Sequence, residues 1–312
     1  MDAPIPLWIL RAAWLTLPFT AWAGVAAAVE GASPAVRVTA AGVGWLVWAA
    51  ALVASALVRP RALVALRLLV PLAPAATAVA LLMAEGDGAL NAGGGDTVRA
   101  LVGFVAGVGA TGLAMLPVVG SYFLNGASYG DEQRFGLRSP GPLLIVLGPL
   151  WILGAGLPVA AVALLAAQRW VLGGAALVAG TAGAWWLWVV TSRLAGRYAV
   201  FVPAGLTLVD PLTLADPVLF ARSRTVSLGP APLEGERADL TGGALGLVVE
   251  LRTDAPTEIV TMERGPDPRA TGADRPRSAR MAAPQDAPAV LFTPAQPAEL
   301  LTVARRRGFE VR

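Results

Sequence analysis

The residues best suited to chemistry lie in one polar loop, residues 125–142, between two long apolar stretches. Asp131 and Glu132 could together hold a metal ion or act as acid and base. Arg134 and Arg138 follow them and could steady a phosphate, as a lipid-modifying enzyme would require. Adjacent carboxylates in a polar loop are more often simply solvated. We therefore favour contact of this loop with anionic lipid headgroups or with the soluble part of the chain.

Two further charged residues, Arg11 and Arg67, fall inside apolar stretches. A charged side chain at mid-bilayer costs at least about 2.5 kcal/mol, so such a residue marks a site unless its side chain reaches the headgroups. Both arginines lie about one and a half turns from the end of a stretch, which favours snorkelling over a buried ion pair or a substrate site. No Asp or Glu lies near the centre of an apolar stretch. This argues against ion-coupled transport and leaves a neutral path open.

A third basic group, Arg305, Arg306 and Arg307, precedes Gly308 near the end of the sequence. These arginines could form a membrane-facing patch or could stabilise the C-terminal end of a helix. Glycine is the residue that most often follows a helix end, because it adopts a left-handed conformation without strain. We therefore favour the helix-end interpretation.

Several kinds of chemistry are excluded by residue types that are missing altogether. The chain has no Cys and no His, and all 24 of its basic residues are Arg. This excludes thiolate nucleophiles, disulfides, Ser-His-Asp triads, Schiff-base lysines and Walker A motifs. The formal net charge of +3 provides no basic surface for nucleic acid. We expect no catalytic residues, no metal, no cofactor and no nucleic-acid partner.

The composition of the chain, with 56% hydrophobic and 14% charged residues, is typical of a membrane protein. The residues named above should therefore be positioned by membrane-spanning helices. A membrane helix needs about 20 apolar residues to cross about 30 Å of hydrocarbon. Six stretches approach this length: 7–29, 39–58, 62–83, 98–124, 143–167 and 171–191. Prolines should kink several of these helices, because each removes a backbone hydrogen bond: Pro18, Pro71, Pro74, Pro117, Pro149 and Pro158.

The orientation follows from the arginines of the short loops. Six of them fall on one side of the membrane: Arg59, Arg61, Arg134, Arg138, Arg193 and Arg197. The positive-inside rule then places both termini in the cytoplasm. Arginine in place of every lysine is typical of a GC-rich bacterial genome. We therefore predict a multi-pass protein of the bacterial plasma membrane.

From Tyr198 onward the pattern changes to short alternating runs separated by turn residues, which predicts a β-rich domain. The candidate strands are residues 198–202, 207–209, 218–220, 225–228, 245–252, 258–262 and 290–293. Residues 264–288 lack apolar periodicity, so we predict a mobile loop there. A helix should begin near Pro297 and end at the arginine run. The predicted domains are thus residues 1–196, helical and membrane-embedded, and residues 197–312, cytosolic, β-rich and able to fold alone.

Seven short strands followed by one helix resemble the bacterial pleckstrin-homology-like domain. The opening run Tyr198-Ala-Val-Phe-Val-Pro-Ala-Gly-Leu-Thr-Leu-Val-Asp resembles the first hairpin of that family, and Leu291-Phe-Thr-Pro-Ala-Gln-Pro-Ala-Glu-Leu-Leu resembles its last strand and helix start. The whole layout is similar to actinobacterial polytopic membrane proteins that carry such a domain. The resemblance implies an architecture rather than an activity. Residues 199–209 contain no basic residue, so phosphoinositide binding is not expected at this hairpin.

The fold class we predict is an α-helical polytopic membrane bundle with a C-terminal β-rich pleckstrin-homology-like domain. The favoured function is a non-enzymatic scaffold whose cytosolic domain serves as an interaction, assembly or regulatory module for another membrane system. Its partners would be membrane lipids and another membrane protein or complex, and oligomerisation is left open. Two alternatives are a transporter or channel with a neutral path, and a lipid-modifying enzyme that uses the 125–142 loop.

Overall fold

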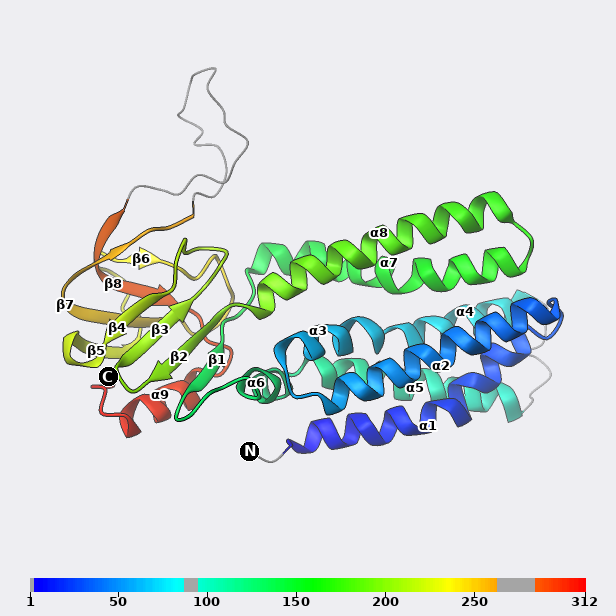
Figure 1. Ribbon diagram of the computed structural model, residues 1–312, viewed down its shortest axis with the longest axis horizontal. Coiled ribbons are helices and arrows are strands. Elements are labelled where there is room, and N and C mark those ends of the chain that lie inside the picture. Colours follow the sequence, from blue (N-terminus) through cyan, green and yellow to red (C-terminus); the bar gives the residue numbers. More distant parts are fainter. Residues whose placement is uncertain (1–2, 87–94, 263–283) are drawn as a thin grey trace, which may run out of the picture. The chain divides into compact units, whose positions relative to one another are not determined.

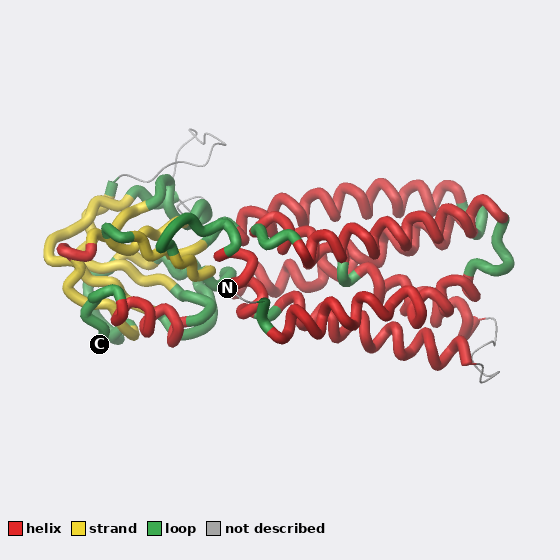
Figure 2. Tube along the Cα trace, turned by 60° about the horizontal axis from the view of Figure 1, so that its bottom comes forward, coloured by secondary structure: helices red, strands yellow, loops and turns green. Residues whose placement is uncertain are grey.

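The computed structural model describes residues 3–86, 95–262 and 284–312. It divides into two compact units. The helical unit comprises Met1–Ala127 and Ile145–Ser192, and the β unit comprises Ser128–Leu144 and Arg193–Arg312. Helices dominate the first unit and strands are confined to the second (Figure 2). The segment Ser128–Leu144 therefore groups with the β unit, although the sequence analysis assigned it to the membrane domain.

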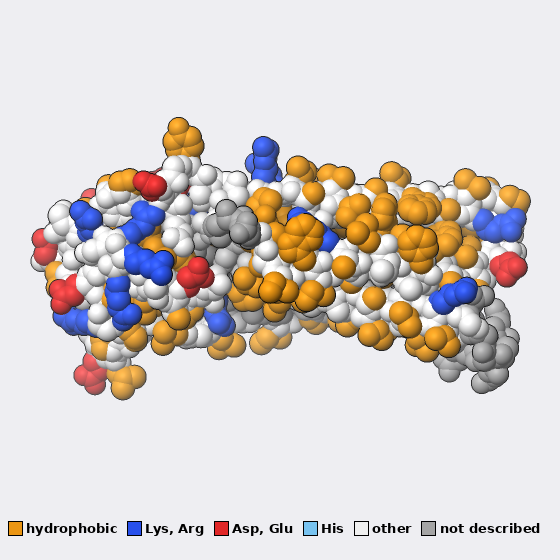
Figure 3. Space-filling model, turned by 90° about the horizontal axis from the view of Figure 1, so that it is seen from below, with side chains coloured by type: hydrophobic (Ala, Val, Ile, Leu, Met, Phe, Trp, Pro, Cys, Tyr) orange, Lys and Arg blue, Asp and Glu red, His pale blue; other side chains and the backbone are white. Residues whose placement is uncertain are grey.

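The helical unit contains the six apolar segments that the sequence predicts. The helices are α1 (Ile5–Ala28), α2 (Pro34–Ala56), α3 (Pro60–Leu69), α4 (Leu72–Gly86), α5 (Gly95–Met115), α6 (Pro117–Asn125), α7 (Gly141–Ala166) and α8 (Trp170–Ala195). Six segments among the described residues are long and apolar enough to cross a bilayer, with α3 and α4 together forming one of them. The chain is thus a multi-pass membrane protein. Hydrophobic side chains cover the face of the helices seen in Figure 3, where they are orange.

Two of the predicted kinks are complete breaks between helices. The third apolar stretch divides at Pro71 into α3 and α4, and the fourth divides at Leu116 into α5 and the short helix α6, which begins at Pro117. Proline lacks the N–H that would continue the helical ladder, so each break leaves backbone carbonyls without their intrahelical donors. Pro18, Pro149 and Pro158 lie inside continuous helices.

The described part of the β unit contains two four-stranded sheets and one α-helix (Figure 1). Its strands are β1 (Gln133–Gly136), β2 (Tyr198–Val202), β3 (Gly205–Val209), β4 (Val218–Ala221), β5 (Thr225–Pro230), β6 (Ala238–Asp239), β7 (Val249–Ile259) and β8 (Gln285–Phe292). The sheet orders are β1-β2-β3-β4 and β5-β7-β8-β6. Helix α9 (Pro297–Arg306) follows the last strand, and Gly308 after it has a positive φ of 79°. The predicted helix end at the arginine run is confirmed.

The most consequential strand, β1, was not predicted. It lies in the polar loop between the fourth and fifth membrane segments and pairs antiparallel with β2, which follows the last membrane helix. Gly136 lies opposite Tyr198, and Gln133 lies opposite Phe201. Phe135 of β1 is buried, with its ring 5.9 Å from that of Phe201 in an edge-on arrangement. The loop thus contributes both backbone pairing and a core side chain to the β unit.

The hydrophobic core of the β unit is formed by residues from both sheets and from α9. Its buried residues include several apolar positions of the predicted β-rich domain: Leu206, Leu208, Val249, Leu251, Val290 and Phe292. Two leucines of the predicted strand 245–252 are exposed instead, Leu245 at 74% and Leu247 at 46%. The strand predicted at 245–252 begins only at Val249, so these two leucines lie in a loop and not on an inward-facing strand.

Two further strand boundaries differ from the prediction. Strand β7 is one element of 11 residues where two strands were predicted, with an irregular register opposite β8 between Arg252 and Thr257. Strand β8 begins at Gln285, inside the segment 264–288 that was predicted to be a loop. Residues 264–283 of that segment lie outside the described residues.

A buried ion pair organises the point where the chain passes from α8 into the β unit. The Nε and Nη2 atoms of Arg197 donate to Oδ1 and Oδ2 of Asp210 at 2.8 and 2.7 Å, and both side chains are about 1% exposed. Arg197 Nη1 also donates to the carbonyl of Arg138 at 2.8 Å. Asp210 in turn accepts the Leu212 N–H and the Thr213 hydroxyl. The pair therefore fixes three segments that are distant in the sequence.

Candidate functional site

The two acidic residues of the polar loop make different contacts. Glu132 Oε2 accepts a hydrogen bond from Arg134 Nη2 at 3.1 Å, next to the start of β1. Asp131 is exposed, and its backbone carbonyl accepts a hydrogen bond from Arg307. The guanidinium of Arg134 lies 5.3 Å from the centre of the Tyr198 ring, a cation–π distance. These contacts join the polar loop to the first sheet and to the segment that follows α9.

The predicted arginines fall at opposite ends of the first sheet. Arg138 lies next to Gly141, where the chain enters α7, and its Nη1 donates to the Leu245 carbonyl at 3.2 Å. Arg307 contacts Asp131, ahead of Gln133, at the end of the sheet away from the α7 and α8 junctions. Arg305 and Arg306 form the exposed last turn of α9. The structure therefore does not bring these arginines into one cluster.

The two intramembrane arginines share an unpredicted role. Arg11 of α1 donates to the carbonyl of Ser55 in the last turn of α2. Arg67 of α3 donates through Nε to the carbonyl of Ala114, at 3.0 Å, just before the α5–α6 break. Carbonyls in the last turn of a helix lack an intrahelical donor and carry partial negative charge. Each arginine thus supplies the donor that a neighbouring helix end lacks.

This contact changes the outcome we expect for Arg67→Leu. Snorkelling alone predicts that leucine is tolerated, whereas loss of the donor to Ala114 leaves a buried carbonyl unpaired at a cost of about 1–3 kcal/mol. We expect the melting temperature of the purified protein in detergent to fall by several degrees. Arg61→Leu, at an exposed position of the same helix, is the matched control. Equal melting temperatures for the two variants would support snorkelling.

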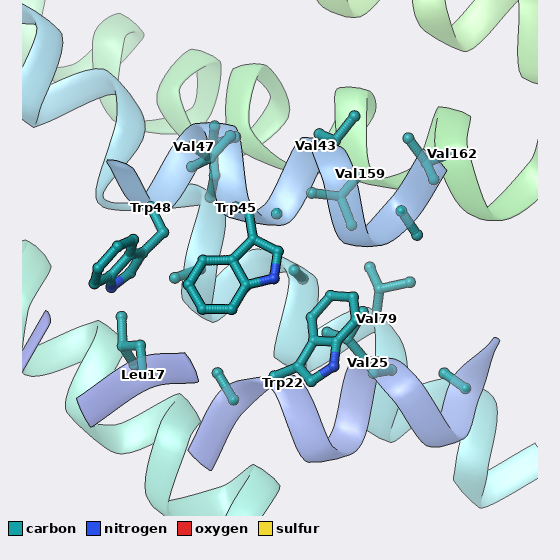
Figure 4. Close-up of a pocket in the computed structure, with 18 of the residues that line it drawn as sticks. Leu17, Trp22, Val25, Val43, Trp45, Val47, Trp48, Val79, Val159 and Val162 are labelled. Atoms are coloured by element: carbon teal, nitrogen blue, oxygen red, sulfur yellow. The ribbon is translucent and has the colours of Figure 1, made fainter. Parts of the chain in front are cut away.

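The helical unit contains an apolar cleft among α1, α2, α4 and α7, with a volume of about 230 Å³ (Figure 4). Small side chains line much of it, and they leave space where larger ones would fill the interior. Four tryptophans also line it: Trp14, Trp22, Trp45 and Trp48. An apolar cavity of about 150 Å³ is enough to hold one benzene molecule. The cleft can therefore hold an apolar group larger than a single ring.

The tryptophans divide into a structural pair and a more open pair. The indole N–H groups of Trp14 and Trp48 each donate to the backbone carbonyl of the other residue at 2.9 Å, which ties α1 to α2. Trp45 packs edge-on against Trp48 at 5.4 Å. Trp22 lies over Gly44, and both it and Trp45 border the space shown in Figure 4. Among the described residues, no hydrogen bond is formed by the indole N–H of Trp22 or Trp45.

The chemistry that this cleft permits is binding rather than catalysis. All of its described lining residues are apolar or aromatic, and the indole N–H of a lining tryptophan is a donor that an ester or hydroxyl oxygen can accept. The cleft was not predicted, although Trp45 and Trp48 have the i, i+3 spacing of one helix face. In the described part of the chain, no group of three or more Asp or Glu side chains could hold a metal ion.

Comparisons with protein-family models, with curated proteins and with solved structures find no match to this chain.

Proposed function

We propose that the protein is a non-enzymatic membrane protein whose β unit serves as an interaction, assembly or regulatory module for another membrane system. The observation that carries this proposal is that two paired strands of the first sheet are directly connected to membrane helices. Strand β1 immediately precedes α7 and strand β2 immediately follows α8, and the two strands are paired. A partner bound to this sheet is thereby coupled through short connections to two membrane helices.

We further propose that the β unit is a pleckstrin-homology-like domain. Two four-stranded sheets and a final helix that buries Leu300, Val303 and Ala304 against the common core support this assignment. The β unit differs from a domain that is continuous in sequence, because its strand β1 comes from the loop before α7. Binding surfaces on the unit include the outer strand β4, whose Leu219 is exposed. An outer strand offers unpaired backbone groups to an extended segment of a partner.

The proposed location is the bacterial plasma membrane, with both termini and the β unit in the cytoplasm. The cysteine-free sequence permits a direct test, because single cysteines at Tyr129 and Trp170 can be labelled without background. A membrane-impermeant maleimide applied to intact spheroplasts should label Trp170→Cys and leave Tyr129→Cys unlabelled. The reverse pattern would invert the orientation.

The function is tested by cross-linking the full chain in its native membrane. A photoreactive amino acid at Leu219 or Leu233, both exposed on the β unit, should yield a discrete adduct with one partner protein. The same residue at Val171, exposed on α8, is the control and should yield only lipid adducts. The β-unit adduct should disappear when Asp210→Ala disrupts that unit. Absence of a protein adduct from every exposed β-unit position would refute the proposal.

A second candidate function is supported by the cleft. A membrane-embedded space lined by indole rings and aliphatic side chains suits one apolar chain of a lipid, which fits the neutral-path alternative of a lipid-handling transporter. A lipid analogue with a diazirine on its acyl chain should label α1 and α2 peptides. Ala76→Phe should reduce that labelling several-fold by filling the cleft, and Val178→Phe, at an exposed position of α8, should not. Equal labelling in both variants would exclude the cleft as the binding site.

A further inference from the structure

Leu245 and Leu247 are exposed close together in the β unit, whereas the other exposed large aliphatic residues of that unit, Leu219, Val226 and Leu233, lie singly. Leu245 and Leu247 belong to residues 241–248, which we call the leucine loop, and this segment contains no charged residue. Most other large aliphatic residues of the neighbouring strands are buried, among them Val249 and Leu251 directly after the loop. The two leucines, separated only by Gly246, are thus exposed in the described part of the β unit.

The leucine loop has a defined backbone. Asp239 Oδ1 accepts the Thr241 N–H at 2.8 Å, and the Thr241 hydroxyl accepts the Gly243 N–H at 3.2 Å. Gly246 has a φ of 137°, a conformation that side-chain-bearing residues rarely adopt, and it allows the chain to turn between the two leucines. The two leucines therefore lie on a loop whose backbone is held by hydrogen bonds.

The loop is attached to the residues that lead into a membrane helix. The Gly141 N–H donates to the Gly243 carbonyl at 3.1 Å, and Pro140 forms a β-bridge with Ala244. Gly141 is the first residue of α7, and the apolar segment of that helix begins at Ile145, about 6 Å further along the helix axis. These contacts hold the leucine loop beside the first residues of α7.

The neighbouring charge also suits a membrane surface. Arg138 is exposed and donates to the Leu245 carbonyl, so a guanidinium lies beside the two leucines. Apolar side chains next to a basic residue are the pattern that binds at the headgroup boundary, where leucine enters the acyl region and arginine meets lipid phosphates.

We infer that Leu245 and Leu247 insert into the headgroup boundary of the membrane that α7 crosses and hold the β unit against the lipid surface. The occupant of this surface is the bilayer, because the backbone contacts at Pro140 and Gly141 are continuous with a membrane-spanning helix. The inference does not depend on the partner of the β unit or on which side of the membrane that unit lies.

The test uses spin labels on the full-length protein in lipid nanodiscs, with single cysteines introduced into the cysteine-free sequence. Labels at Leu245→Cys and Leu247→Cys should collide several-fold more with oxygen, relative to a water-soluble nickel complex, than a label at Leu233→Cys. Leu233 is 100% exposed in the same unit and is the aqueous control. Ile152→Cys, exposed on α7, is the lipid reference.

Two outcomes would overturn the inference. Collision ratios at both loop positions equal to those of Leu233→Cys would place the loop in water. Protection from both oxygen and nickel would show that a protein surface, and not lipid, covers the leucines. Because both labels replace exposed side chains, folding should be retained, and an unchanged melting temperature would verify this for each variant.

Discussion

Asp210→Ala should unfold the β unit in a large fraction of molecules while the helical unit remains inserted. The substitution leaves the guanidinium of Arg197 buried without its carboxylate, and removal of one partner of a buried pair costs about 3–5 kcal/mol. That is comparable to the whole stability of a small domain, about 5–15 kcal/mol. Hydrogen exchange of peptides from β2, β3 and β7 in the full-length protein should accelerate strongly.

The exposed pair Arg224–Asp254 provides the matched control for this prediction. Its side chains are 51% and 53% exposed at a separation of 3.3 Å, so solvent screens the interaction and Asp254→Ala should change stability by less than about 1 kcal/mol. Replacing both buried partners, as in Arg197→Met with Asp210→Leu, should restore much of the loss because no charge remains buried. Equal exchange rates for Asp210→Ala and the wild type would mean that the pair does not organise the junction.

Phe135→Ala should destabilise the β unit although the residue lies between two membrane helices in the sequence. Truncation of a buried phenylalanine costs about 3–5 kcal/mol, and here it also removes the edge contact with Phe201. Tyr129→Ala, in the same loop but 87% exposed, should be neutral. Limited proteolysis of full-length protein in nanodiscs should cleave the β unit faster only in the Phe135 variant.

The same feature revises the expectation that residues 197–312 fold alone. That segment lacks β1, together with the core side chains of Phe135 and Leu137, and it leaves the β2 edge unpaired. We expect a soluble fragment to fold only when residues 128–140 are joined to it. A stable, cooperatively unfolding fragment 197–312 would show instead that β1 is dispensable.

The membrane segments were predictable because their signal is local and strong: about 20 consecutive apolar residues have few alternative structures in a membrane protein. Strand β1 was not predictable in this way, because its four residues Gln-Arg-Phe-Gly form no alternating apolar run. They become a strand only by pairing with β2. The strand predicted at 245–252 begins too early because Leu245 and Leu247 continue the alternation of Val249 and Leu251. Alternation alone does not distinguish a strand from an ordered loop that displays the same residues.

The candidate sites were harder to predict than the fold, because their residues contact partners that are distant in the sequence. Arg197 was interpreted only as a loop charge, because nothing near it in the sequence identifies Asp210 as its buried partner. The tryptophans of the apolar cleft come from different helices and meet only after those helices pack. In the described part of the chain, the charged loop residues make packing contacts that composition could not reveal.

The position of β1 and β2 on either side of the α7–α8 hairpin also constrains biosynthesis. Because Phe135 is synthesised before this hairpin and its core partners after it, the β unit cannot complete its core until both helices have emerged from the ribosome. The pairing of Gly136 with Tyr198 further requires the start of α7 and the end of α8 to lie on the same face of the membrane. The β core is therefore completed only in chains whose α7–α8 hairpin has been inserted correctly. A quality-control protease that cleaves unpaired β2 would remove the chains in which the hairpin is misinserted.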